Sequence, residues 1–222
     1  IIDHLMTLLP FEPPYFEKFG LTTTYVGHPV LESGADRGDG FAFRDRYRID
    51  EKEHVILLLF GSRRTEIARH IPEFFETISL LREMVGSFRV ITVTSPYTRD
   101  IISKAIKAWP YDITLISDPS QKFDAFAASD VSLAASGTVA LELAMAMVPS
   151  IIAYRTNPFT AWFAKRLVNI SFANLVNLTL EREVVPEFLF ERCQANLMAP
   201  ALQKLITSEN ARIQQSDGYA EA

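Results

Sequence analysis

From residue 54 to about residue 155, short apolar runs alternate with longer segments in which apolar residues recur at the spacing of a helix. The run from Val55 to Phe60 is continuously apolar, which is typical of a strand buried on both faces of a parallel sheet. Helical patterns separate such runs, and this order indicates right-handed βαβ crossovers. Strands are predicted at 55–60, 88–94, 112–116, 130–134 and 150–154, and helices at 64–84, 97–108, 121–128, 138–147 and 158–168. The sequence therefore predicts an α/β fold with a parallel sheet flanked by helices.

The two ends of the chain show a weaker pattern. Residues 1–31 contain recurring prolines and glycines, so we predict strand ends and turns there, with a short helix at 15–19. Residues 32–53 are polar and charged, with glycines in their middle, which predicts a linker or domain boundary. Beyond residue 155, helices are expected at 187–193 and 195–207.

Composition narrows the class of protein. Hydrophobic residues make up 48% of the 222 residues, enough for a substantial core, and the net charge of −5 argues against general nucleic-acid binding. The single cysteine, Cys193, excludes an internal disulfide and a cysteine-based metal site, and it suits a reducing cytoplasm. The four histidines lack metal-ligand spacing, and no apolar run reaches the roughly 20 residues of a membrane span. We expect no metal and no cofactor.

A turn of small residues, Ser136-Gly137-Thr138, follows the predicted strand 130–134 and leads into a helix. Its backbone N–H groups and the positive end of the helix dipole suit an anion such as a diphosphate. Glu142 lies one helical turn past Thr138, where its carboxylate can accept bonds from the two hydroxyls of a ribose. Alternatively, Ser136 only caps the helix and Glu142 is a solvated helix residue. This segment alone does not decide between the two interpretations.

A second small-residue turn, Gly61-Ser62-Arg63, follows the predicted strand 55–60. Arg63 can hold a phosphate with two parallel hydrogen bonds. The alternative is a surface ion pair with Glu66, three residues further along the helix. Ligands of open α/β sheets bind beyond the carboxyl ends of the strands, where both turns would lie. Together the two turns predict a nucleotide site.

The segment from Pro158 to Val168 combines aromatic and basic residues. Pro158 suits the first turn of a helix, which would place Phe159, Phe163 and Arg166 on one broad face. These aromatics either belong to an ordinary core or form a face that meets a lipid surface, an acyl chain or a partner subunit.

The order and spacing of these motifs resemble the lipid A disaccharide synthases, a family of inverting glycosyltransferases with two Rossmann-like domains that face each other across a cleft. Single motifs such as Ser-Gly-Thr are weak, but the match continues in order to about residue 190. The residues that carry the resemblance are Leu8-Leu9-Pro10-Phe11-Glu12, Val26-Gly27-His28-Pro29, Gly61-Ser62-Arg63 with Glu66, Ala135-Ser136-Gly137-Thr138 with Leu141-Glu142, Tyr154-Arg155, Pro158-Phe159-Thr160, Ala164-Lys165-Arg166-Leu167-Val168, Asn177, and Val184-Val185-Pro186-Glu187.

The resemblance implies a domain division. Residues 1–31 would be the tail of an N-terminal domain, 32–53 the boundary, and 54–222 the Rossmann-like UDP-sugar-binding domain of a GT-B glycosyltransferase, with helices at its C-terminus. The chain also begins with Ile1 within an apolar pattern, so we expect it to be part of a longer protein. The general base would belong to the missing N-terminal domain, and we expect this portion alone to be inactive.

The resemblance also implies a reaction. The enzyme would transfer 2,3-diacylglucosamine from UDP to 2,3-diacylglucosamine 1-phosphate, forming UDP and the β-1,6-linked lipid A disaccharide precursor of lipopolysaccharide. Arg63 would stabilise the charge of the departing diphosphate. The acylated substrates imply a peripheral enzyme on the cytoplasmic face of the bacterial inner membrane. The resemblance leaves open whether the enzyme is a homodimer. The implied UDP-sugar-binding residues are Gly61, Ser62, Arg63, Ser136, Gly137, Thr138, Glu142 and Asn177.

The resemblance leaves some points open. Phe60 stands where the family usually has proline, and Val176 and Glu181 stand where it usually has proline and glycine. The chain could instead belong to another UDP-sugar enzyme, such as a UDP-N-acetylglucosamine epimerase, or be a non-catalytic nucleotide-binding module. Acylated and unacylated UDP-sugars would separate the two enzymes, and a UDP titration would test the non-catalytic module.

Overall fold

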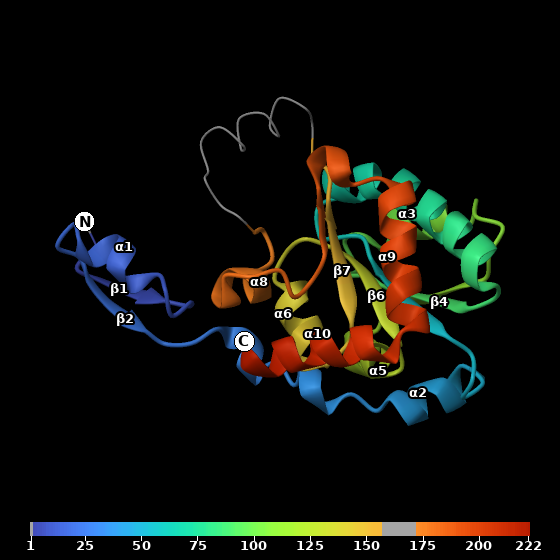
Figure 1. Cartoon of the computed structure of the whole chain (residues 1–222), viewed down its shortest axis with the longest axis horizontal. Helices are drawn as coiled ribbons and strands as arrows, with labels where there is room; N and C mark the ends of the chain where they lie inside the picture. Colours follow the sequence, from blue (N-terminus) through green and yellow to red (C-terminus); the bar gives the residue numbers. More distant parts are fainter. Residues whose placement is uncertain (1, 157–171) are drawn as a thin grey trace.

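A six-stranded parallel sheet forms the centre of the computed structural model, which describes residues 2–156 and 172–222 (Figure 1). The strand order is β5-β4-β3-β6-β7-β8. Along the chain, β4 and β5 extend the sheet from one side of β3, whereas β6, β7 and β8 extend it from the other. The junction between β3 and β6 is thus a topological switch point, where ligands of open α/β sheets bind. The bounds are β3 Val55–Leu59, β4 Arg89–Val93, β5 Ile113–Ile116, β6 Val131–Ala135, β7 Ser150–Tyr154 and β8 Glu187–Leu189.

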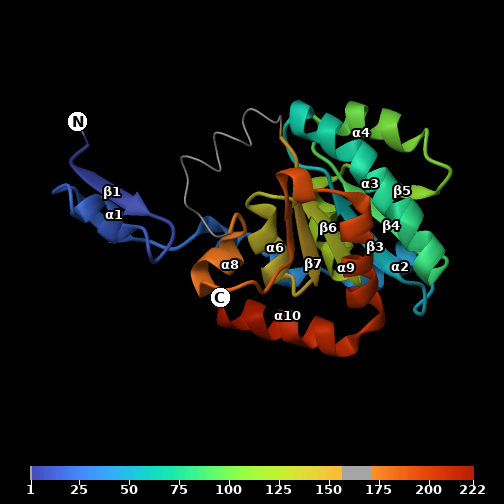
Figure 2. The same cartoon turned by 45° about the horizontal axis from the view of Figure 1, so that its top comes forward.

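Helices cover both faces of the sheet (Figure 2). The first face carries α3 (Arg64–Val85), α4 (Arg99–Ile106) and α9 (Ala195–Thr207). The second face carries α5 (Lys122–Ala127), α6 (Val139–Met145) and α8 (Leu175–Leu180). Two further helices, α2 (Gly40–Arg46) and α10 (Glu209–Glu221), pack at the edge of the second layer.

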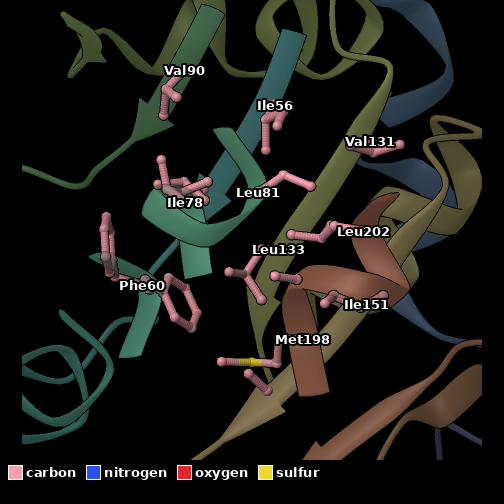
Figure 3. Packing of buried hydrophobic residues seen from close by; sticks show 14 of the residues in the cluster. Ile56, Phe60, Ile78, Leu81, Val90, Val131, Leu133, Ile151, Met198 and Leu202 are labelled. Atoms are coloured by element: carbon pink, nitrogen blue, oxygen red, sulfur yellow. The ribbon is translucent and has the colours of Figure 1, made fainter. Parts of the chain in front are cut away.

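Strand β3 supplies side chains to both core layers, because alternate residues of a strand point to opposite faces. All of its residues are buried, as the continuous apolar run predicts. Ile56 and Leu58 belong to the layer under α3 and α9, and Figure 3 shows Ile56 in this layer with Leu202 of α9. Leu57 and Leu59 belong to the opposite layer, under α5 and α6.

The strands predicted between residues 55 and 154 are all present, and no predicted end differs from the observed end by more than one residue. The helices predicted at 64–84, 97–108, 121–128, 138–147 and 195–207 correspond to α3, α4, α5, α6 and α9. The predicted helix at 158–168 lies outside the described residues.

The helix predicted at 187–193 is wrong. Residues Glu187–Leu189 form strand β8, and Phe190–Arg192 form a 3₁₀ turn. The register pairs Ile152 of β7 with Glu187, and the buried Glu187 carboxylate accepts the backbone N–H groups of Ala173 and Asn174 at 2.8 and 3.0 Å. Pairing with β7 therefore overrides the helix-forming composition of this segment.

Helix α10 has no apolar stripe that would predict it, and polar contacts attach it to the sheet. The side chain of Gln215 accepts the N–H of Ser150 at 2.6 Å and donates to its carbonyl at 3.0 Å. The hydroxyls of Tyr219 and Ser150 lie 2.9 Å apart. Gly218 allows close approach, because a Cβ there would lie 2.4 Å from a methyl carbon of Val184.

The N-terminal part of the chain forms a small unit of its own. Strands β1 (His4–Thr7) and β2 (Thr22–Tyr25) pair in parallel, with α1 (Pro13–Glu17) between them. Figures 1 and 2 both show this unit beside the main sheet rather than within it. The segment 32–53 contains α2, and Phe43 of this helix is buried in the core. This segment is therefore partly packed on the main body, and the domain division stays a prediction.

Candidate functional site

The two small-residue turns lie side by side at the carboxyl edge of the sheet. Strands β3 and β6 are neighbours, with Leu59 paired to Ala134, so both chains leave the sheet at the same level. Gly61 has a φ of 101°, which side chains rarely adopt. A Cβ at Gly61 would lie 3.4 Å from the Cβ of Ala135, at the end of β6. The turns 61–63 and 136–138 thus border the same space.

The turn at 136–138 offers fewer backbone donors than its sequence suggests. The N–H of Ser136 donates to the carbonyl of Ala153 at 2.9 Å, which extends the pairing of β6 with β7. Within the described parts of the chain, the N–H groups of Gly137 and Thr138 have no hydrogen-bond acceptor. Thr138, not Ser136, is the N-cap of α6, and its side chain makes no capping bond. Gly137 and Thr138 are therefore the donors that a ligand can reach.

Glu142 lies in the first turn of α6 and forms an ion pair with Lys122 at the start of α5. The Lys122 Nζ is 2.6 Å from one carboxylate oxygen and 2.7 Å from the other. The Glu142 side chain is 19% exposed and that of Lys122 is 30% exposed. Glu142 is therefore not a freely solvated helix residue. The sequence gives no sign of the role of Lys122, since a lysine at the start of a predicted helix carries no signal of a partner 20 residues away.

Arg63 forms the ion pair with Glu66 that the alternative to phosphate binding predicts. Its Nη1 donates to Glu66 at 2.6 Å, while the Arg63 side chain is 76% exposed and that of Glu66 is 12% exposed. This hydrogen bond raises the pKa of Arg63 above its ordinary value. A guanidinium has five N–H donors, so one bond to Glu66 does not exhaust it. The observed ion pair is compatible with either role.

His70, on α3, ties together the ends of two strands that are not neighbours. Its Nε2 accepts the backbone N–H of Arg155 at 3.1 Å, and its Nδ1 lies 3.0 Å from the carbonyl of Phe60. Since a backbone N–H can only donate, Nδ1 carries the proton and donates to Phe60. Burial lowers the pKa of His70 and favours this neutral form. His70 thus fixes the carbonyl directly before Gly61.

Asn177 departs from its expected role. It is fully buried, and its Oδ1 accepts the N–H groups of Val184 and Val185 at 2.8 and 2.9 Å. Its Nδ2 donates to the carbonyl of Val185 and to Glu187, both at 2.7 Å. The two donor and two acceptor positions of the amide are all used by the chain itself. Asn177 therefore holds the loop before β8, and its side-chain amide has no hydrogen-bonding position left for a nucleotide.

A separate hollow lies beyond the ends of β7 and β8. Glu73, Arg155, Cys193 and Gln194 are among its lining residues, and Arg155 forms an ion pair with Glu73. Burial raises the pKa of Cys193 to about 11, so its thiol is a poor nucleophile near neutral pH.

None of the described helices is both long and apolar enough to cross a membrane.

The parallel sheet, its strand order and the turns at its carboxyl edge define one half of a GT-B glycosyltransferase fold. Among solved structures, the MnaA–UDP co-structure from S. aureus matches 97% of this chain and 54% of that chain, with a TM-score of 0.64 and 16% identity. WaaG, a glycosyltransferase involved in lipopolysaccharide biosynthesis, matches 97% of this chain and 57% of that chain, with a TM-score of 0.58 and 14% identity. At these identities the likeness shows the fold alone.

The chain belongs to the lipid-A-disaccharide synthetase family, whose sequence profile matches residues 1–221. It is 46% identical over 221 residues to lipid-A-disaccharide synthase of Rhodospirillum centenum, covering 99% of this chain and 55% of that protein. It is 43% identical over 224 residues to the Paramagnetospirillum magneticum synthase, covering 100% and 57%. The chain thus spans about half the length of these relatives.

Proposed function

We propose that this chain is the UDP-sugar-binding portion of a lipid-A-disaccharide synthase. The whole protein would transfer 2,3-diacylglucosamine from UDP to 2,3-diacylglucosamine 1-phosphate. The observation that carries the proposal is the adjacency of the turns 61–63 and 136–138, with Glu142 one helical turn further on. Family membership supports the choice of substrates.

In this proposal the two turns bind the diphosphate. The N–H groups of Gly137 and Thr138 have no acceptor among the described residues, and both residues are exposed in the turn next to the one that contains Arg63. Helix α3 begins directly after Arg63. The N-terminal end of a long helix adds positive potential at that point. Negative charge grows on the diphosphate as the sugar leaves, so these donors would stabilise the transition state more than the bound substrate. Glu142 would accept the ribose hydroxyls.

The remaining groups would come from outside this chain. Residues 1–31 would be the tail of an N-terminal domain and 54–222 the UDP-sugar domain, with the acceptor site and general base in the part of the longer relatives that this chain does not span. We propose that the whole protein works at the cytoplasmic face of the inner membrane, because its substrates would carry acyl chains. Co-sedimentation with anionic liposomes and sedimentation velocity would test membrane binding and a homodimer.

The direct test is a UDP titration of the natural, full-length protein with Glu142→Gln. This change keeps the shape of the side chain but replaces the carboxylate, which would accept both ribose hydroxyls, with a neutral amide that has only one acceptor oxygen. We expect UDP binding to weaken by roughly 1–3 kcal/mol, the range for a hydrogen bond to a charged group. Glu83→Gln on the exposed side of α3 is the matched control and should leave UDP affinity unchanged. Equal affinities for wild type and Glu142→Gln, with both folded, would refute the assignment.

A UDP-sugar epimerase is the second candidate, because a putative UDP-N-acetylglucosamine 2-epimerase from Listeria monocytogenes shares this fold, with a TM-score of 0.50 and 14% identity. An epimerase would act on a UDP-sugar without an acyl chain and without an acceptor. Formation of a disaccharide product from acylated UDP-glucosamine and its 1-phosphate acceptor would support the synthase. Conversion of UDP-N-acetylglucosamine, which carries no fatty acyl chain, in the absence of an acceptor would support the epimerase.

A further inference from the structure

The ion pair between Lys122 and Glu142 joins two elements that the chain reaches by separate crossovers. Lys122 is the first residue of α5, which follows β5, whereas Glu142 is in the first turn of α6, which follows β6. The ammonium contacts both carboxylate oxygens, at 2.6 and 2.7 Å. It also lies 5.0 Å from the centre of the Phe123 ring, which limits its positions. The pair is therefore a fixed contact between two helix starts.

The contact leaves Glu142 able to accept further hydrogen bonds. A carboxylate has about four lone-pair sites, and the ammonium takes one on each oxygen. One site on each oxygen remains for a hydroxyl. Because one ammonium holds both oxygens, the carboxylate cannot rotate freely, and its orientation is set before a ligand arrives. Pre-orientation reduces the entropy that binding would otherwise lose.

The charge of Lys122 also bears on a neighbouring anion. Glu142 follows the turn whose free N–H groups would bind a diphosphate, and an unpaired carboxylate there would repel that ligand. The same arrangement recurs at the first turn, where Arg63 pairs with Glu66. Glu66 and Glu142 are thus each paired with a cation.

We infer that Lys122 is a positioning residue of the sugar-nucleotide site, which orients the Glu142 carboxylate toward the ribose hydroxyls and balances its charge beside the diphosphate. This inference rests on the proposed UDP site. It makes Lys122 act through Glu142 rather than on the ligand itself. Its removal should therefore reduce the preference for a ribose over a deoxyribose, which a purely structural role would not do.

The experiment compares UDP with 2′-deoxy-UDP in calorimetric titrations of the full-length protein. Lys122→Met keeps most of the length of the side chain and removes its charge. We expect it to weaken UDP binding roughly three- to tenfold and to affect 2′-deoxy-UDP less. Lys122→Arg keeps a cation and should recover most of the affinity. Lys104→Met, at an exposed position of α4, makes the same change in net charge and should leave both affinities unchanged.

A double-mutant cycle with Glu142→Gln decides how Lys122 acts. If Lys122 works through Glu142, Lys122→Met has no further effect on UDP binding in the Glu142→Gln background. Additive losses would overturn the inference, and so would tighter UDP binding by Lys122→Met, which would make Lys122 a competitor of the ribose. If Glu142→Gln itself leaves both affinities unchanged, the proposed site fails and the inference fails with it. If only Lys122→Met behaves like wild type, the site stands and the inference alone is refuted.

Discussion

Replacing Asn177 with alanine removes the amide that holds the loop between α8 and β8. This side chain is fully buried and makes four hydrogen bonds, between 2.7 and 2.9 Å, to Val184, Val185 and Glu187. Alanine leaves the backbone N–H and carbonyl of Val185 without this partner in a region where Val185 is itself buried. The loop should then loosen together with β8 at the edge of the sheet.

The size of the effect follows from the groups that lose a partner. A net hydrogen bond contributes about 1 kcal/mol, and a buried polar group left unpaired costs about 1–3 kcal/mol. Two such backbone groups together with the cavity predict a loss of roughly 3–5 kcal/mol in the free energy of unfolding. This is a large part of the roughly 5–15 kcal/mol that stabilises a typical protein.

Urea denaturation measures this loss. The midpoint should fall with an unchanged m-value, which marks a change in stability alone. Asn196→Ala is the matched control, because Asn196 is exposed on α9 and its replacement should change stability by only about 0.5 kcal/mol or less. A loss below about 1 kcal/mol for Asn177→Ala would refute the reasoning. A UDP affinity that falls more than stability explains would restore Asn177 to the site.

Two further predictions concern stability. Burial lowers the pKa of His70, on which Arg155 and Arg69 act in the same direction and Glu66 in the opposite one. The unfolded chain therefore binds more protons than the folded one between the lowered pKa of folded His70 and the ordinary histidine pKa of about 6.5. The free energy of unfolding should fall as pH decreases from there, by at most about 1.4 kcal/mol per pH unit, and urea titrations of His70→Asn should show a smaller slope. Glu181 has a left-handed φ of 52°, which favours glycine, so Glu181→Gly should raise the free energy of unfolding by up to about 1 kcal/mol. Glu183→Gly, at a position without a left-handed φ, should lower it, and thermal melts that show the same change for both would contradict this account.

Local sequence determined the parallel core and the two turns. The run from Val55 to Phe60 can only be buried on both faces, and helical spacing on either side of such runs dictates crossovers. A turn after each strand then reaches the same edge because the strands are parallel. For that reason Gly61, Arg63, Gly137 and Thr138 could be grouped without a structure. The family resemblance added the identity of the nucleotide, UDP, and of the acylated substrates.

Tertiary structure decided the features that depend on a distant partner. Residues Glu187–Leu189 form β8 because they pair with β7, and α10 is attached through Gln215 and Tyr219 although it has no apolar stripe. Asn177 and Ser136 also lose their expected free polar groups to contacts that no local pattern encodes. The same holds for the pairing of Lys122 with Glu142, since two helix starts meet only once the sheet has formed. Sequence periodicity reports which face of an element is buried, whereas the partner of a polar side chain depends on which elements the fold brings together.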